Sequence, residues 1–335
     1  MGVFRVERAT RESRAFAAVL IIGLLVLASL PYWAGSGNMR LVSEMAYYLA
    51  LAQLWNLLAG YAGLVSVGQQ AFVGIGAYTL FYLASELDLH PLFALTLAAP
   101  VCALMSVPMA LLIFRLRGAY FAVGTWVLAE TLQLAVSLIT PLGAGSGMSL
   151  TPAIVRQIAP DRAGREMIVY WISLAIAIAV SAIVYLLLRS KHGLALTAIR
   201  DSERASESLG VDTYRTKLMI YVVTAACTGV VGAFIFLQKL RLSPEAGFSI
   251  NDWTVVVIFM VVIGGIGTLE GPIIGMLIYF VLREFLADYG TWYLILLGVV
   301  AVAIMLRARE GIWGLVAHKF NLHLFSVRRH LTRSL

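Results

Sequence analysis

The chain has 335 residues, of which 61% are hydrophobic and 13% are charged, and its mean hydropathy is +0.88. A soluble domain cannot bury that much apolar surface, so the composition excludes a soluble globular protein and indicates a polytopic membrane protein. The formal net charge of +7 reflects basic residues that cluster near the chain ends and between apolar runs. This distribution is typical of membrane topology, and we expect no nucleic-acid partner.

Apolar runs of roughly the 20 residues that a membrane helix needs recur along the chain. They predict an all-α integral membrane protein with about ten transmembrane helices, in a range of about eight to ten. The range stays open because glycines near Gly60 and Gly267 are compatible with broken or re-entrant segments. We expect one transmembrane permease-like domain over residues 1–335. The expected spans are 15–33, 42–58, 65–85, 92–114, 119–140, 167–188, 218–237, 253–266, 272–287 and 292–306.

The first span has one alternative reading. Four arginines within residues 5–14 precede it, as in a secretory signal peptide. However, no Ala-x-Ala cleavage pattern follows, and Pro31, Tyr32 and Trp33 resemble an interfacial boundary. We therefore expect this span to be retained.

Basic residues predict which loops face the cytoplasm. With ten spans, the N-terminal arginines, Arg115 and Arg117, the segment 189–217 and the basic tail 307–335 all fall on one side. We expect both termini to be cytoplasmic and residues 190–216 to form a cytoplasmic loop. The bias is imperfect, because the opposite side also carries basic residues. These are Arg40, Arg156, Arg162, Arg165, Lys239 and Arg241.

The charged segment 189–217 is the most distinctive part of the chain. Apolar residues between its charges predict one or two short amphipathic helices, and Gly210 is placed to end the second one. Arg204 and Glu207 are spaced i, i+3 and could form an ion pair. A connection of about 27 residues exceeds ordinary loop lengths, which favours docking of a partner over a solvated loop without a role.

Glycines crowd residues 56–78 and favour either close helix packing or unwound backbone beside a cavity. Asn56, Gln69 and Gln70 in this run make it a candidate translocation path. Later in the chain, Gly267, Gly271 and Gly275 recur every four residues and predict one stripe of close helix contact. Pro272 is expected to break the helix there.

Glu130 lies near the middle of an apolar span, where a carboxyl group costs several kcal/mol unless it is neutral or paired. We expect it to face the bundle interior or a wet cavity and to share hydrogen bonds with Gln133. A structural pairing and a contact with substrate remain equally open.

The glycine-rich run 264–271 lacks the terminal Gly-Lys-Ser/Thr of a phosphate-binding loop. No Ser/His/Asp constellation or metal-ligand cluster stands out either. We expect no catalytic residue, no metal site and no bound cofactor in this chain, and we do not expect an enzyme.

Four strings, in order, carry a resemblance to a known family. They are N-L-L-A-G-Y-A-G-L-V-S-V-G-Q-Q-A-F-V-G-I-G-A-Y from Asn56, F-R-L-R-G-A-Y-F-A-V from Phe114, G-L-A-L-T-A-I-R-D-S-E-R-A-S-E-S-L-G-V-D-T-Y-R-T-K-L from Gly193, and V-V-I-G-G-I-G-T-L-E-G-P-I-I-G from Val261. Over roughly residues 49–314 the chain resembles the LivM-type permeases of branched-chain amino acid ABC transporters.

Two departures from the usual patterns accompany this resemblance. In the E-A-A-x-x-x-G pattern of ABC importer permeases, Arg204 replaces the glutamate, Ala205 matches, and Ser206 replaces the second alanine. An F-R-P-x-G-like ending of the family appears here without its proline, as residues 306–311.

The resemblance implies an ABC importer permease fold and a translocation path for branched-chain amino acids in the inner membrane. The partners it implies are a LivH-type permease, two ATPase subunits that carry ATP and Mg²⁺, a periplasmic substrate-binding protein, and membrane lipid. It also implies a coupling helix for the ATPases. Its residues are Ile199, Arg200, Asp201, Glu203, Arg204, Ala205, Ser206, Leu209 and Gly210.

Three alternatives stay open. A urea or other small-amide importer belongs to the same family, and the chain alone does not separate it from an amino acid importer. A stand-alone secondary transporter or channel would need grouped charges in mid-membrane, and only Glu130 stands out there. A membrane-anchored enzyme would need a catalytic constellation.

Overall fold

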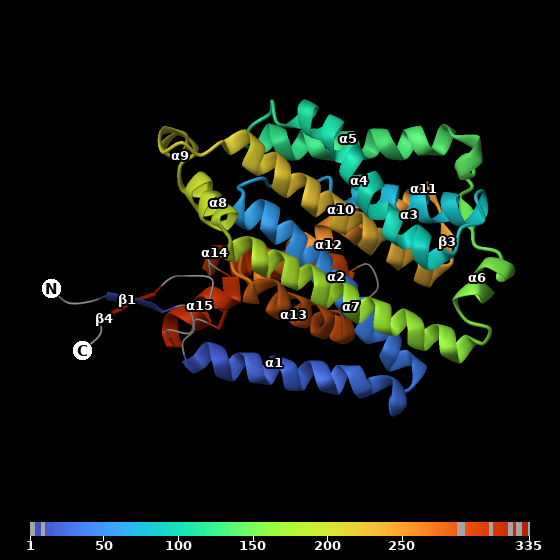
Figure 1. Cartoon of the computed structure of the whole chain (residues 1–335), viewed down its shortest axis with the longest axis horizontal. Helices are drawn as coiled ribbons and strands as arrows, with labels where there is room; N and C mark the ends of the chain where they lie inside the picture. Colours follow the sequence, from blue (N-terminus) through green and yellow to red (C-terminus); the bar gives the residue numbers. More distant parts are fainter. Residues whose placement is uncertain are drawn as a thin grey trace.

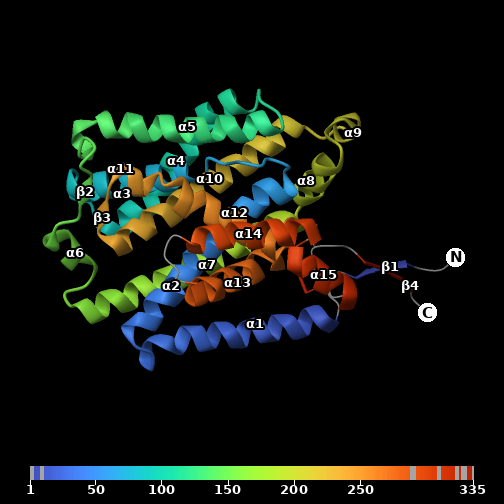
Figure 2. The same ribbon diagram turned by 180° about the vertical axis from the view of Figure 1, so that it is seen from behind.

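The long apolar runs fold into helices, whose internal hydrogen bonds satisfy the backbone polar groups without water. The computed structural model describes residues 4–7, 11–286, 292–307, 311–320, 324–325 and 330–333. The long helices run side by side between two ends of the molecule (Figures 1 and 2). The prediction of an all-α fold is confirmed, because the described strands are limited to two short antiparallel pairs.

The first half of the chain forms seven helices. They are α1 (Arg11–Ser29), α2 (Ser36–Asn56), α3 (Gln70–Ser85), α4 (Pro91–Ile113), α5 (Ala119–Leu138), α6 (Pro152–Ile158) and α7 (Arg162–Arg189). A 3₁₀ turn (Leu30–Tyr32) follows α1, a π-helical turn (Leu57–Tyr61) extends α2, and a 3₁₀ turn (Thr140–Leu142) follows α5.

The second half continues the bundle from α8 to α15. These helices are α8 (Lys191–Asp201), α9 (Glu203–Ser208), α10 (Thr213–Lys239), α11 (Pro244–Gly247), α12 (Val256–Gly264), α13 (Glu270–Leu286), α14 (Trp292–Arg307) and α15 (Gly311–Phe320). A π-helical turn (Asn251–Val255) leads into α12. Strand β1 (Phe4–Glu7) pairs with β4 (His330–Arg333), and β2 (Met148–Ser149) pairs with β3 (Arg241–Leu242).

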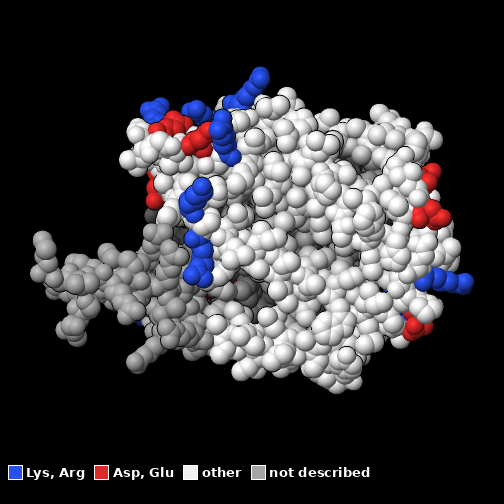
Figure 3. Space-filling view, in the orientation of Figure 1, with Lys and Arg blue, Asp and Glu red and all other residues white. Residues whose placement is uncertain are grey.

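Every apolar segment expected to be a span lies mainly in a helix. Among the described residues, five helices are long and apolar enough to cross a membrane: Pro91–Ile113, Ala119–Leu138, Arg162–Arg189, Thr213–Lys239 and Pro244–Gly264. The remaining apolar helices are shorter or broken, so the number of about ten crossings stays a prediction. On the face shown in Figure 3, charged side chains gather at the two ends and leave a broad uncharged zone between them.

Helix α10 forms the centre of the core. It packs against α2, α3 and α4, and large side chains such as Phe234, Phe236 and Trp253 are almost completely buried around it. Helix α5 is the opposite case, because it lies along one edge of the bundle (Figure 1) and most of its side chains are exposed or half-buried. The core therefore leaves one long face of α5 without a partner among the described residues.

The bundle is interrupted in two places that meet at the same end. After the π-helical turn 57–61 the chain runs without helix through residues 62–69 before α3 begins. A second break separates α12 from α13 at residues 265–269. We expected Pro272 to cause this break, and that is wrong: Pro272 lies in the first turn of α13, where its missing N–H costs nothing.

The expected three-glycine stripe also needs correction. Gly267 lies in the turn between the helices with φ +76°, so it is not part of the helical stripe with Gly271 and Gly275. Instead, Gly264 at the end of α12 meets these two glycines. A Cβ on Gly264 would clash with the Gly271 carbonyl, and one on Gly275 would clash with the Met260 carbonyl. Close backbone approach thus joins α12 to α13.

This contact predicts the effect of a single methyl group. We expect Gly275→Ala to lower the unfolding temperature in detergent by several degrees, because overpacking costs about 1–3 kcal/mol. The matched control is Gly298→Ala in α14, where an added Cβ meets nothing within 4 Å. The two variants are heated in detergent to a series of temperatures, and size-exclusion chromatography measures the fraction that remains folded at each one. Equal unfolding temperatures would contradict the packing role of Gly275.

Candidate functional site

The charged segment folds into two short helices joined by one residue. Ser190 caps the start of α8 by accepting a hydrogen bond from the His192 N–H at 3.1 Å. Ser202 lies between the helices in an extended conformation, with φ −161°. It donates its own N–H to the Ala198 carbonyl at 2.9 Å and accepts the Ala205 N–H at 3.3 Å, so it closes α8 and caps α9.

The end of α9 confirms the predicted role of Gly210. Gly210 has φ +84°, a conformation that is costly for other residues. Its N–H donates to Glu207 O at 2.9 Å, and the Val211 N–H donates to Ser206 O at 3.0 Å. This pair of bonds is a Schellman motif, which stops the helix and turns the chain towards α10.

The α8–α9 pair has a buried face and an exposed face. Leu196 and Ile199 are buried where α8 packs on α7 and α10, and Ser206 is buried in α9. On the other side, Leu209 is 81% exposed and Leu194 is 52% exposed. Asp201, Glu203, Arg204, Ala205 and Gly210 are exposed as well. Of the coupling residues predicted from the sequence, Ile199 and Ser206 are buried against the bundle, and the others are exposed.

The ion pairs of this segment differ from the expected one. Glu207 does not pair with Arg204 but accepts a hydrogen bond from Thr213 Oγ1 at 2.8 Å. Glu203 pairs with Lys217 at 2.7 Å and so ties α9 to the start of α10. These bonds hold α9 against α10, and Arg204 is exposed.

Arg200 links the α8–α9 pair to the interior of the bundle. Its Nη1 donates to the carbonyl oxygen of Gly60 in the π-helical turn at 3.2 Å. The same Nη1 lies 3.1 Å from the position that a Cβ on Gly267 would occupy. Arg200 thus bonds to the interruption at 57–61 and lies beside the one at 265–269.

Asn56 joins these two interruptions to each other. Its side chain is completely buried. Nδ2 donates to the Thr268 carbonyl at 2.7 Å, and Oδ1 accepts the Gly267 N–H at 2.8 Å. Gln53, one turn earlier, donates to the Leu269 carbonyl at 2.9 Å. Sequence reasoning missed Gln53, although a buried amide three residues before Asn56 on an apolar helix was a usable signal.

The other two polar residues of the glycine-rich run are also interior. Gln69 donates through Nε2 to the Leu51 carbonyl at 3.2 Å. Gln70 and Thr254 are hydrogen-bonded through their side chains, and the Gln70 N–H donates to Thr254 Oγ1 at 3.3 Å. Both glutamines hold the start of α3 against neighbouring helices, and within the described part of the chain neither forms a hydrogen bond with Glu130.

Glu130 and Gln133 lie on α5, at the edge of the bundle. Glu130 is half-buried and accepts a hydrogen bond from the Trp126 Nε1 at 3.0 Å, in place of the expected sharing with Gln133. The unwound segment 62–69 runs beside this helix, because the Val67 N–H donates to Thr125 Oγ1 at 3.0 Å. Gly63 and Val65 in that segment are exposed. The irregular segment 62–69 therefore runs beside α5, and Glu130 lies further along the same helix.

Comparison with known proteins places most of the described chain in one family. The family model for the permease component of branched-chain amino acid transport systems matches residues 39–307, from α2 to α14. The "High-affinity branched-chain amino acid transport system permease protein LivM" proteins of Salmonella typhimurium and Escherichia coli are each 26% identical over 317 residues, which cover 88% of this chain and 74% of those proteins.

A more distant relative is the "Probable branched-chain amino acid transport permease protein LivH" of Methanocaldococcus jannaschii, 28% identical over 130 residues. That match covers 36% of this chain and 39% of the relative. No solved structure matches the chain. The family match and the apolar helices together identify a multi-pass membrane protein. The resemblance seen in the four sequence strings is confirmed, and the chain belongs to the family of branched-chain amino acid transport system permease components, as a LivM-type member.

Proposed function

We propose that this chain is the permease subunit of an ATP-driven importer of branched-chain amino acids, with residues 1–335 as one transmembrane domain. One observation carries the proposal: an exposed, capped helix pair, α8–α9, lies at one end of the bundle and reaches both interruptions of the bundle through Arg200. Movement of the pair would therefore reach the membrane-embedded breaks. A connection of this kind suits a transport subunit and not an enzyme.

Two ATPase subunits would supply the movement, and ATP and Mg²⁺ would bind to them and not to this chain. The docking surface would be the exposed face of α8–α9, with Leu209 as its apolar centre and Asp201, Glu203 and Arg204 as its charged rim. Burial of this largely exposed leucine in an apolar groove of a partner would remove its side chain from water, and the capped helix would hold it in place.

The end of the bundle that carries α8–α9 would lie on the cytoplasmic side of the inner membrane. Strands β1 and β4 lie at that end (Figures 1 and 2), which supports cytoplasmic termini. Residues 190–216 would then be the cytoplasmic coupling loop. The proposed basic tail, 307–335, lies partly outside the described residues. A periplasmic substrate-binding protein would dock at the opposite end, around α6.

A second, LivH-type permease would complete the translocation path along the open face of α5. Glu130 supports this placement, because a carboxyl group in mid-helix is costly against lipid and tolerable against protein or water. The unwound segment 62–69 points the same way, since irregular backbone at membrane depth is tolerated where protein or a wet cavity covers it. Glu130 and Gln133 would line the path, and Asn56, Gln69 and Gln70 would hold its wall.

Reconstituted vesicles test the coupling. With the partner permease, ATPases and binding protein present, wild type is expected to take up leucine only when ATP is supplied. Leu209→Glu is expected to reduce ATPase docking and uptake at least tenfold, because it places a charge at the apolar centre of the surface. The matched control is Leu315→Glu, an exposed leucine (54%) on α15.

Three results would contradict the proposal. Equal uptake by both variants would remove the coupling role of α8–α9. Substantial leucine flux without ATPases would favour a stand-alone transporter or channel. ATP-driven uptake of urea in place of leucine would move the substrate to the small amides.

A further inference from the structure

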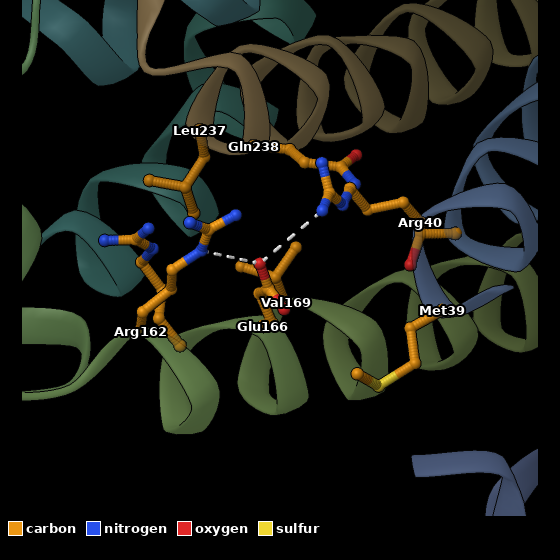
Figure 4. Close-up of a pocket in the computed structure, with 9 residues that line it drawn as sticks. Met39, Arg40, Arg162, Glu166, Val169, Leu237 and Gln238 are labelled. Carbon is orange, nitrogen blue, oxygen red and sulfur yellow. Dashed lines mark hydrogen bonds and ion pairs between the residues drawn. The ribbon is translucent and has the colours of Figure 1, made fainter. Parts of the chain in front are cut away.

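The basic residues that oppose the expected charge bias have a common location. They lie at the end of the bundle opposite α8–α9, and three of them line one cavity of about 240 Å³. This cavity lies between the first turns of α2 and α7 and the last turn of α10 (Figure 4). Its lining residues are Met39, Arg40, Ser43, Arg162, Arg165, Glu166, Val169, Leu237 and Gln238.

The charges around the cavity do not balance. Three arginines face a single carboxylate, Glu166. Arg162 Nε lies 3.1 Å from Glu166 Oε1, and Arg40 Nη2 lies 4.0 Å from the same oxygen (Figure 4). Arg165 forms no ion pair within the part of the chain that the structure describes. The cavity thus has more guanidinium groups than its one carboxylate can pair with. A guanidinium group binds a carboxylate through two parallel N–H hydrogen bonds.

Glu166 keeps one oxygen free for a cation. Both of its ion pairs use Oε1, and Oε2 has no hydrogen-bond partner among the described residues. Its side chain is 20% exposed, so the carboxylate is sheltered and still reachable from the cavity. A small cationic group such as an ammonium could therefore bind at Oε2.

The rest of the lining is apolar or neutral. Met39, Val169 and Leu237 are buried residues whose side chains border the cavity. The volume is below the roughly 300–1,000 Å³ of pockets for drug-sized ligands and suits a smaller molecule. Donors for a carboxylate, an acceptor for an ammonium and an aliphatic wall are the three parts that an aliphatic α-amino acid requires.

We propose that this cavity binds one free aliphatic α-amino acid, with its carboxylate at Arg162 and Arg165, its ammonium at Glu166 Oε2 and its side chain against Met39, Val169 and Leu237. The inference rests on the proposed function, which supplies the substrate class and places this end outside the cytoplasm. The site would receive substrate from the binding protein before it enters the path along α5.

Direct binding of radiolabelled leucine to the full-length chain in phosphatidylcholine nanodiscs tests the site. Arg165→Gln and Glu166→Gln are each expected to weaken leucine binding at least tenfold. The matched control is Arg215→Gln, an exposed arginine near the start of α10 that does not line the cavity. Unlabelled leucine should displace radiolabelled leucine from the wild type at least tenfold better than either of two analogues does. These are leucinamide, which lacks the carboxylate, and 4-methylpentanoate, which lacks the ammonium.

The two variants should also change these preferences separately. Arg165→Gln should narrow the preference for leucine over leucinamide, and Glu166→Gln should narrow the preference for leucine over 4-methylpentanoate. Misfolding would not produce this crossed pattern. If a variant fails to fold, displacement by the two analogues on wild type still decides whether both charged groups are recognised.

Several results would overturn the inference. One is leucine binding that neither variant changes. Another is unchanged leucine binding with weaker docking of the binding protein, which would make the arginines a protein-docking surface. A third is absence of leucine binding with variant-dependent retention of phosphatidylglycerol, which would indicate a lipid site. Parallel uptake assays on the assembled importer separate the two proposals: normal ATP-driven leucine uptake with any of these results would contradict the site and not the proposed function.

Discussion

Asn56→Ala is expected to lower the free energy of unfolding by about 2–6 kcal/mol, because it leaves two backbone groups inside the bundle without their hydrogen-bond partner. The Gly267 N–H and the Thr268 carbonyl both bond to this side chain, at 2.8 and 2.7 Å, and alanine can replace neither bond. Each buried polar group left without a partner costs about 1–3 kcal/mol. We expect a fall of several degrees or more in the unfolding temperature.

The matched control is Asn38→Ala, an exposed asparagine in the first turn of α2. Surface substitutions of this kind usually change stability by less than about 0.5 kcal/mol. Fluorescence-detected unfolding in detergent compares both variants with wild type. Similar stability of the two variants would mean that the turn 265–269 does not depend on Asn56.

Arg200→Met is expected to uncouple ATP hydrolysis from uptake. The substitution keeps the length and the apolar stem of the side chain and removes the hydrogen bond to the Gly60 carbonyl. A hydrogen bond from a charged donor contributes about 1.5–3 kcal/mol, and because the Arg200 side chain is 38% exposed we take the lower end. We therefore expect uptake to fall roughly tenfold while ATPase docking continues.

The measurement is the ratio of leucine transported to ATP hydrolysed in vesicles that contain the whole importer. A purely structural role would lower both quantities together, whereas a coupling role lowers the ratio. Arg200→Lys, which can still donate to Gly60, should restore part of the ratio. Arg215→Met is the matched control, since the Arg215 side chain is 85% exposed and its ion pair is with the nearby Asp212. An unchanged ratio in Arg200→Met would remove Arg200 from the coupling route.

Asn56 and Arg200 both contact the two breaks in the bundle or the residues beside them. Asn56 joins the breaks at 57–61 and 265–269 to each other, and Arg200 bonds α8 to the first break and lies beside the second. Since helices are stiff and breaks are not, the breaks are where a bundle can change shape. The contacts that connect them lie far from the proposed amino acid cavity, so variants at the two ends should have separable effects on coupling and on binding.

The sequence by itself determined the features that arise within one stretch of chain. Apolar length predicted the helices, because a run of about 20 apolar residues has few other stable conformations in lipid. Gly210 predicted the end of α9, because a left-handed residue after a helix strongly favours glycine. Four ordered strings were enough to recognise the family, and the match over residues 39–307 agrees with them.

Only the tertiary structure decided which distant residues meet. Gly267 had the spacing of a packing stripe, but the helix starts after it, so it serves the turn instead. Arg200 stood among surface charges, and its hydrogen bond to Gly60 spans 140 positions of the chain. Arg40 and Glu166 became neighbours because α2 and α7 pack together. Local patterns specify helices and caps through short-range sterics and burial, whereas partners across the bundle depend on how all the helices pack at once.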